Sequence, residues 1–493
     1  MNRVASGLRA LGIERNERVG VYLPKQFETV TAMFGATAAG GVFVPINPIL
    51  KPEQVGHILR DCATSILITS PDRARLLSDT LAECPDLIQV IVTGGEDVGP
   101  STGHSIPMCN WEQLLGNAQA PELRRIDSDM AAILYTSGST GRPKGVVLSH
   151  HNMQSGAESV ATYLKNQADD RLLAVLPFSF DYGLSQLTTA FSVGASVVLM
   201  DYLLPRDVIR AVARYQVTGL AAVPPLWNQL ADLPWPDEAV ACLRYITNSG
   251  GAMPVATTSR LQEALPGTDV YLMYGLTEAF RSTYLAPGQV KSRPESMGKA
   301  IPNADIMVVR ADGTECDPEE PGELVHRGAL VALGYWGDRE KTDIRFKPAP
   351  GQPAGLPNPE IAVWSGDQVR RDKEGYLYFI GRNDEMIKTS GYRVSPGEIE
   401  EVLFDLSEVK QAVAFGASHP QLGSGIVLIV QTASDSLEVD AILAHCRIHL
   451  PMFMLPGHIE IVTDLPRNPN GKIDRKSLST QFTNIFTGPE KTV

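Results

Sequence analysis

Apolar residues recur along the chain at two spacings, one typical of helices and the other typical of strands. Val4, Leu8 and Leu11 lie on one face of a predicted helix that ends at Gly12, where a glycine can cap it. Compact apolar runs of strand length follow. They predict strands at 19–23, 42–45, 65–69, 87–92, 130–135, 172–176, 195–199 and 219–223, with helical patterns between them at 28–39 and 51–62.

The pattern changes after Pro302, where Asp-Gly, Pro-Gly and Glu-Gly turns separate short β segments. These segments are predicted at 306–309, 322–325 and 376–380. A charged, glycine-rich stretch follows, and beyond it the pattern predicts a helix at 396–406, strands at 409–415 and 426–432, and a helix from Val439.

These elements predict an α/β protein of two domains. Alternating strands and helices favour a large N-terminal domain of packed, mostly parallel sheets with helices. The last hundred or so residues have the size and pattern of a small α+β C-terminal domain. We place the boundary at Asp384, which gives a large domain of 1–383 and a small domain of 384–493.

Composition narrows the class of protein without indicating its chemistry. The 493 residues exceed what one hydrophobic core usually organises, in agreement with two domains. A net charge of −13 without basic clusters argues against a nucleic-acid partner. Residues 1–20 lack a signal-peptide core, and the apolar stretch 31–46 is too short to span a bilayer. We therefore expect a cytoplasmic protein without membrane insertion.

A glycine- and hydroxyl-rich loop directly follows the strand predicted at 130–135. It has the sequence Tyr135-Thr136-Ser137-Gly138-Ser139-Thr140-Gly141-Arg142-Pro143-Lys144-Gly145. Glycines allow backbone N–H groups to approach phosphates, hydroxyls donate hydrogen bonds, and Lys144 supplies positive charge. Pro143 and Gly145 distinguish the loop from the Walker loop, which needs Gly and Ser or Thr at those positions. The pattern predicts a loop that holds a triphosphate.

This loop closely resembles the signature of the adenylate-forming (AMP-binding) superfamily, which includes acyl-CoA synthetases, adenylation domains of peptide synthetases and luciferases. The resemblance covers nearly the whole chain, because other family motifs follow in the family's order. They are Gly250-Gly251-Ala252, Tyr274-Gly275-Leu276-Thr277-Glu278, Trp364-Ser365-Gly366-Asp367, Gly381-Arg382-Asn383-Asp384, and 466–475 with Lys472.

The resemblance implies ATP and Mg²⁺ as cofactors, with Glu278 near the metal, Asp367 on the ribose and Lys472 as the catalytic lysine. The implied cofactor-binding residues are Thr136, Ser137, Gly138, Ser139, Thr140, Gly141, Lys144, Gly250, Gly251, Ala252, Tyr274, Gly275, Thr277, Asp367, Arg382 and Lys472. The implied catalytic residues are Lys472, Thr277, Glu278, Thr136 and Lys144. A carboxylate attacks an α-phosphate poorly because both are anions, so neutralisation and positioning would carry the reaction.

The resemblance also implies a second half-reaction, in which a thiol attacks the acyl-AMP. The small domain rotates about Asp384 in the family, and Ser390, Gly391 and Arg393 match the residues that line the thiol entry. The acceptor is then CoA or the phosphopantetheine of a separate carrier protein, since no carrier module follows Val493. Members of the family usually carry some dozens of residues before the helix that corresponds to the predicted first helix of this chain.

The segment after Leu176 holds the clearest specificity feature, because Asp181 stands where amino-acid-activating relatives place the partner of the substrate's ammonium group. A buried carboxylate needs a cation. Asp181 therefore pairs with an amino or imino acid, or it hydrogen-bonds nearby backbone as a cap. Arg281 either faces solvent or pairs with Asp181. The predicted substrate residues are Phe180, Asp181, Tyr182, Ser185, Thr247, Ser249, Met273, Arg281 and Ser282.

Three functions remain open from the sequence. The first is an AMP-forming acid–thiol ligase that delivers an amino or imino acid to a carrier protein or CoA. The second, with the same fold, is an acyl-CoA synthetase for a fatty or aryl acid, or a ligase that makes acyl-AMP without a thioester. The third is a non-catalytic nucleotide-binding relative, against which the intact Lys144, Glu278, Asp367, Arg382 and Lys472 argue.

Overall fold

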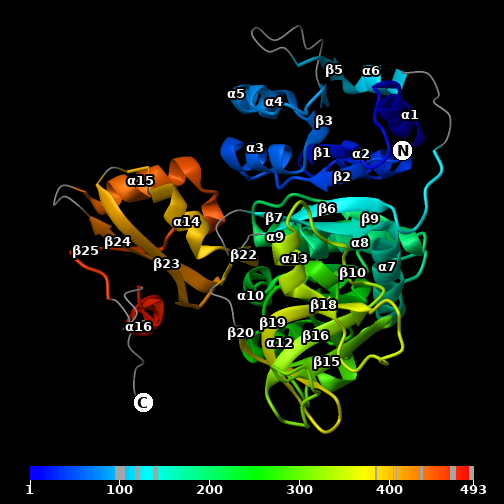
Figure 1. Cartoon of the computed structure of the whole chain (residues 1–493). Helices are drawn as coiled ribbons and strands as arrows, with labels where there is room; N and C mark the ends of the chain where they lie inside the picture. The colour runs from blue at the N-terminus through cyan, green and yellow to red at the C-terminus, as the bar shows by residue number, and fades with distance from the viewer. Residues whose placement is uncertain are drawn as a thin grey trace.

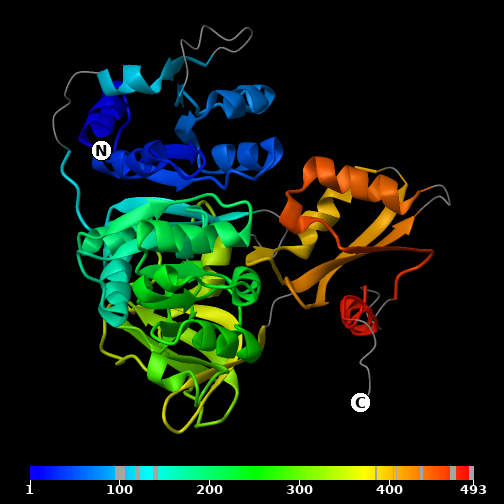
Figure 2. The same ribbon diagram turned by 180° about the vertical axis from the view of Figure 1, so that it is seen from behind.

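The computed structural model of the chain describes residues 1–94, 106–116, 123–136, 143–382, 386–403, 405–406, 408–432, 437–466 and 473–487. Figure 1 shows an upper lobe in blue and cyan, a lower lobe in cyan, green and yellow, and an orange and red small domain beside them. Figure 2, from behind, shows the same arrangement, with the N-terminus on the upper lobe and the C-terminus at the small domain.

The first sheet has eight strands among the described residues. In spatial order they are β17 (Gly334–Tyr335), β7 (Lys144–Ser149), β6 (Met130–Thr136), β2 (Val42–Pro45), β1 (Arg18–Tyr22), β3 (Thr64–Thr69), β4 (Gln89–Val92) and β5 (Met108–Asn110). The strands from β6 to β5 pair in parallel, whereas β7 is antiparallel to both neighbours. Its helices are α1 (Asn2–Ala10), α2 (Phe27–Ala38), α3 (Pro52–Asp61), α4 (Pro71–Leu76), α5 (Ser78–Ala82) and α6 (Trp111–Gly116).

The second sheet has twelve described strands and changes direction partway across. It runs β15 (Ala304–Val309), β16 (Gly322–Gly328), β19 (Ile361–Arg371), β20 (Leu377–Arg382), β14 (Ser296–Ala300), β13 (Thr283–Leu285), β12 (Asp269–Tyr274), β11 (Tyr245–Asn248), β10 (Gly219–Ala222), β8 (Arg171–Ala174) and β9 (Ser196–Leu199), with β18 (Phe346–Pro348) paired to β19. The strands from β12 to β9 are parallel, and the pairs from β15 to β12 are antiparallel.

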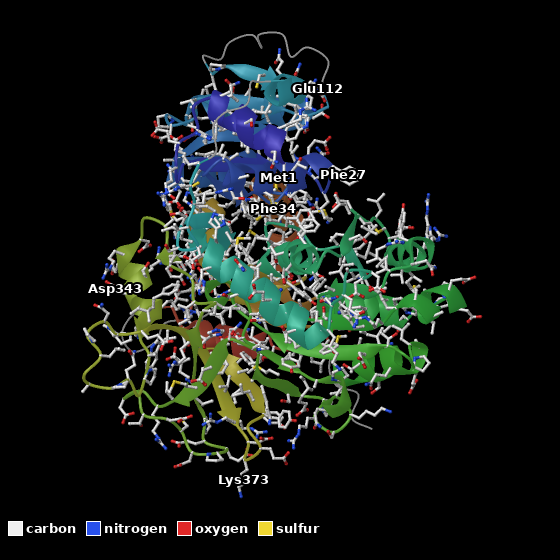
Figure 3. All side chains as sticks on the ribbon, turned by 90° about the vertical axis from the view of Figure 1, so that its right-hand side faces the viewer. Met1, Phe27, Phe34, Glu112, Asp343 and Lys373 are labelled. Carbon is white, nitrogen blue, oxygen red and sulfur yellow. The ribbon has the colours of Figure 1, made fainter. Side chains whose placement is uncertain are left out.

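The lower lobe carries its helices around these strands. They are α7 (His150–Leu164), α8 (Asp181–Ser192), α9 (Pro205–Tyr215), α10 (Pro224–Ala231), α11 (Asp237–Cys242), α12 (Val255–Ala264) and α13 (Arg339–Arg345), with the 3₁₀ turns η1 (Thr277–Ala279) and η2 (Pro287–Gln289). Phe34 of α2 meets Phe191 of α8 edge-on, with 5.7 Å between ring centroids. Figure 3 labels Phe34 where the upper lobe meets the lower one. One apolar core therefore joins both lobes.

The small domain has its own sheet and its own apolar core. Its strands are β21 (Ile387–Thr389), β22 (Tyr392–Val394), β23 (Val409–His419), β24 (Gly423–Thr432) and β25 (His458–Val462), and its helical segments are α14 (Pro396–Leu403), α15 (Val439–His449), η3 (Met452–Met454) and α16 (Arg475–Gln481). Long β23 and β24 pair antiparallel, which buries one face of the sheet under α14 and α15.

The structure confirms the α/β fold with a smaller α+β C-terminal domain. The predicted strand at 65–69 is β3, and the predicted helix at 396–406 is α14, which ends earlier. The sheets are mixed, because β7 is antiparallel to both neighbours in the first sheet and the strands from β12 to β15 pair antiparallel in the second. No helix in the described part of the chain is both long and apolar enough to cross a lipid bilayer.

Candidate active site

A cavity of about 180 Å³ lies where the large domain faces the small one. Its lining combines Thr136, Asp181 and Glu278 from the large domain with Gly391 and Glu398 from the small domain. Several predicted motifs, far apart in the sequence, therefore meet at one place.

The hairpin of β6 and β7 brings the two ends of the predicted phosphate loop together. Thr136 pairs directly with Lys144 across the hairpin. The Thr136 hydroxyl is buried, and no described residue accepts from it or donates to it. A buried hydroxyl without a partner normally has one in a bound ligand or water. Ser137, Gly138, Ser139, Thr140 and Gly141 lie outside the described residues.

Lys144, Glu278 and Tyr335 form what we call the lysine–glutamate cluster. The ammonium of Lys144 donates to the Tyr335 hydroxyl at 2.5 Å, and that hydroxyl donates to the Glu278 carboxylate at 2.6 Å. The Lys144 ammonium and the Glu278 carboxylate are 3.5 Å apart. Sequence reasoning missed Tyr335, because a tyrosine in a two-residue strand carries no periodic signal.

The cluster shifts the titration of both charged groups. Burial lowers the pKa of Lys144 to about 8, although Glu278 acts in the opposite direction. Burial alone would raise the pKa of Glu278, but the charges of Lys144 and Arg393 and the hydrogen bond from Tyr335 lower it to about 2. Glu278 is therefore ionised at neutral pH. No group of three or more metal-binding side chains occurs within the described ranges.

The predicted nucleotide motifs are connected to one another. The Tyr274 hydroxyl donates to the Asp367 carboxylate at 2.5 Å. In the β-sheet, the backbone of Asp367 in β19 lies opposite the backbone of Arg382, the last residue of β20. Gly250 has φ +78, in the left-handed region that favours glycine. The neighbouring Gly251 accepts a hydrogen bond from the Asn248 amide, and Ala252 continues this turn after β11.

Asp181 and Arg281 form a buried ion pair with 2.9 Å between nitrogen and oxygen. Both side chains are at most 5% exposed, so the alternative of a solvent-facing Arg281 is wrong and the alternative of pairing is confirmed. Burial raises the pKa of Asp181, and Arg281 acts in the opposite direction. Thr277 lies 3.5 Å from the other carboxylate oxygen of Asp181. The guanidinium carbon of Arg281 lies 4.6 Å from the centre of the Tyr182 ring.

The other predicted substrate residues divide into lining and supporting positions. Phe180 and Ser249 line the cavity, together with Gly275 of the predicted nucleotide motif. The remaining ones lie behind the lining and form side-chain hydrogen bonds. These bonds join Tyr182 and Thr247 at 2.6 Å, Met273 and Tyr163 at 3.0 Å, Ser282 and His326 at 2.9 Å, and Ser185 and Thr189 at 3.5 Å. They shape the cavity through the residues they hold.

The hairpin of β21 and β22 carries the small domain into the cavity. Ser390 and Gly391 form its two-residue turn with φ of 53 and 82, as a type I′ turn requires. Gly391 and Arg393 line the cavity. A Cβ atom on Gly391 would lie 2.8 Å from Val223, so the hairpin tip has no room for a side chain.

Glu398 of α14 is a second residue that sequence reasoning missed. It accepts a hydrogen bond from Gln54 of α3 at 3.0 Å, which links the two domains beside the cavity. Burial raises the pKa of Glu398 to about 7. The predicted pivot Asp384 and the predicted catalytic residue Lys472 lie outside the described residues.

Comparisons with known proteins agree with this arrangement. The model of the AMP-binding enzyme family matches residues 1–336, and that of the AMP-binding enzyme C-terminal domain matches residues 398–472. The L-proline–[L-prolyl-carrier protein] ligase of Streptomyces coelicolor is 31% identical over 96% of this chain and 89% of its own length. A long-chain-fatty-acid–CoA ligase of Yersinia pestis is 27% identical over 97% of this chain and 88% of its own length.

Two solved structures share the fold. The o-succinylbenzoate CoA synthetase of Bacillus subtilis has a TM-score of 0.82 at 24% identity, over 97% of this chain and 92% of that one. An amide bond synthetase of Marinactinospora thermotolerans has a TM-score of 0.84 at 22% identity, over 98% of this chain and 93% of that one.

These matches confirm the resemblance stated from the motifs, and the chain belongs to the AMP-binding enzyme family. It is an AMP-forming ligase, as the relatives named ligases and synthetases indicate.

Proposed function

We propose that this ligase activates a small carboxylic acid with ATP and transfers the acyl group to the thiol of phosphopantetheine, on CoA or on a carrier protein. The observation that carries the proposal is the shared cavity. There the residues of the nucleotide motifs face the hairpin that resembles the family's thiol entry.

In the first half-reaction, a carboxylate oxygen of the acid attacks the α-phosphorus of ATP, and the bond from that phosphorus to pyrophosphate breaks. Thr136 and Lys144 would hold the departing pyrophosphate, and Thr277 would contact the α-phosphate. Lys472 is the proposed catalytic lysine, on the resemblance of its loop to that of the family. Each group neutralises or positions charge and exchanges no bond with the substrate.

Glu278 is the residue that we propose for Mg²⁺. A lone carboxylate fits this role, because Mg²⁺ commonly takes one or two protein carboxylates and completes its shell with phosphate oxygens and water. The low pKa of Glu278 keeps that carboxylate ionised. When bound, the metal would offset the phosphate charge. ATP is the proposed nucleotide, with Asp367 at the ribose and the turn at 250–252 near the base. Arg382 would also reach the nucleotide.

In the second half-reaction, the thiol sulfur attacks the carbonyl carbon of the acyl-AMP. The bond from that carbon to the AMP oxygen breaks, and the thiol proton leaves to solvent. Ser390, Gly391 and Arg393 would border the thiol's path. We retain domains of 1–383 and 384–493, with Asp384 as the pivot about which the small domain turns between the two half-reactions.

Two substrate classes have separate support. An amino or imino acid agrees with the proline ligase relative and with Asp181 as an ammonium partner. An acid without an amine, such as an aryl or fatty acid, agrees with the Arg281 guanidinium already paired to Asp181. The fatty-acid ligase relative supports the same class.

ATP–pyrophosphate exchange over amino, aryl and fatty acids tests the first half-reaction, and thioester formation with CoA or a phosphopantetheinylated carrier protein tests the second. Lys472→Ala should nearly abolish exchange while the thermal unfolding temperature stays unchanged. Gly391→Trp should block thioester formation and spare exchange, because the tip already abuts Val223. Gly267→Trp, where the added Cβ meets nothing within 4 Å, is the matched control. Exchange retained by Lys472→Ala would contradict the assignment of the lysine.

A further inference from the structure

Arg281 has hydrogen-bonding capacity that its ion pair does not use. Its Nη1 donates to the Asp181 carboxylate at 2.9 Å and to the Phe280 carbonyl at 3.0 Å. Its Nε and Nη2 are buried, and no described residue accepts from either nitrogen. Buried donors without acceptors are rare in native proteins, and each needs an explanation such as a bound partner.

The backbone fixes where this guanidinium lies. Phe280 is fully buried at φ 55, a left-handed conformation that a bulky residue adopts only under constraint. A Cβ atom on Gly275 would lie 3.2 Å from the Arg281 Cα, so the backbone at Gly275 packs closely against that of Arg281. The Tyr182 ring supports the guanidinium from the side. Arg281 is therefore held in place at the cavity lining.

The partner that these donors need is an acceptor. Asp181 already neutralises Arg281, so the pair carries no net charge. A second carboxylate would leave one uncompensated negative charge beside Asp181 and near Glu278, which a buried site disfavours. An ammonium group would bring only further donors to Nε and Nη2 of Arg281, which are themselves donors. A neutral oxygen satisfies the donors without adding charge.

We infer that Arg281 is a specificity residue, and that it donates from Nε and Nη2 to a neutral hydroxyl or carbonyl oxygen carried by the acid substrate apart from its reacting carboxylate. This inference rests on the proposed function. It selects, among small acids, hydroxy and oxo acids over their unsubstituted parents.

The test compares ATP–pyrophosphate exchange with matched sets of acids. Each set holds a parent acid, its hydroxy and oxo derivatives, the amino derivative and a dicarboxylate, over graded chain lengths and an aromatic ring. In the wild type, a hydroxy or oxo acid should exceed its parent in kcat/KM by at least about tenfold. Arg281→Met should bring that ratio near one, because kcat/KM should decrease for the hydroxy or oxo acid and stay unchanged for the parent acid.

Arg281→Met leaves Asp181 without its cation, so the double variant Asp181→Asn/Arg281→Met repeats the measurement with both charges removed. Arg293→Met is the matched control, because it removes a guanidinium paired to Asp372 outside the cavity lining. The ratio should stay at the wild-type value in this control.

Four results overturn the inference while exchange itself persists. Three of them are a wild-type preference for the parent acid, for the amino derivative or for the dicarboxylate. The fourth is an equal decrease in kcat/KM for all acids in the Arg281 variants, which would place the reacting carboxylate on Arg281. Wild-type enzyme that exchanges pyrophosphate with no acid overturns the proposed function and this inference together.

Discussion

Two buried ion pairs border the same cavity and are built differently. In the lysine–glutamate cluster, the Tyr335 hydroxyl joins Lys144 to Glu278 and accepts and donates one bond. The pair of Asp181 and Arg281 has no such bridge, and two of its guanidinium nitrogens meet no described acceptor. The side chains of both pairs are similarly buried, and the pairs differ in how many buried donors lack a described acceptor.

The difference separates two tasks that buried charges perform. A bridged pair keeps charges of both signs ready in a dry site, where they act strongly on phosphates and metal. A pair with open donors discriminates between ligands, because any ligand that fails to satisfy those donors leaves them unpaired. Neither pair is itself strong evidence for stability, since desolvation offsets much of the attraction.

The largest expected effect comes from breaking the unbridged pair. Arg281→Met should lower the free energy of unfolding by about 3–5 kcal/mol, because Asp181 is left charged and buried. Lys144→Met should lower it by about 1–3 kcal/mol, because Tyr335 still donates to Glu278. Urea denaturation of both variants makes the comparison. Asp181→Asn/Arg281→Met should recover most of the loss, and equal losses in the two single variants would contradict the distinction.

A pH profile sharpens the role of the bridged pair. Because the pKa of Lys144 is about 8, its charged form declines above that pH, and kcat/KM for ATP should fall about tenfold per pH unit there. Lys144→Arg should flatten this decline, since a guanidinium stays charged. A wild-type profile without a decline above pH 8 would contradict the shifted pKa.

The stability contribution of Lys144 runs in the opposite direction. Folding lowers the pKa of Lys144 from the usual 10.5. The free energy of unfolding is therefore higher above pH 10.5, where the amine is neutral in both states, and it decreases as the pH falls through about 8. Activity therefore needs the form that stability disfavours.

The smallest effect concerns Glu398, a third carboxylate at the cavity, which accepts a hydrogen bond from the neutral Gln54. Its pKa is raised to about 7, so its stabilising effect is fully present below pH 4.5 and is lost as pH rises through 7. Proteolysis between the domains should increase by a factor that corresponds to about 1 kcal/mol over this range. Glu398→Gln should remove the pH dependence. Unchanged pH dependence in that variant would assign it to another group.

Local patterns in the sequence predicted much of the fold, and long-range contacts explain what they did not predict. The run at 65–69 is apolar on both faces and buried, as a central parallel strand requires. The strand β19 was not predicted, because Ser365-Gly366-Asp367 interrupts its apolar pattern, and Gly366 has φ +70. The antiparallel half of the second sheet has no crossover helices to signal its direction.

The candidate site shows the same limit. Motif order brought Thr136, Lys144 and Glu278 into the prediction. Thr136 and Glu278 line one cavity, and Lys144 lies 3.5 Å from the Glu278 carboxylate. The contact of Tyr335 with this set spans 191 residues from Lys144, and no local pattern reports a contact of that range. Asp181 and Arg281, likewise, are 100 residues apart, so their pairing stayed one of two alternatives.

The strand β7 lies between β6 and β17, and its register sets the positions of Thr136, Lys144 and Tyr335 together. Side chains alternate between the two faces of a strand, so loss of one residue within β7 would turn its flanking positions to the opposite faces. Inherited deletions in this strand should therefore be far rarer among active descendants than substitutions at its individual positions.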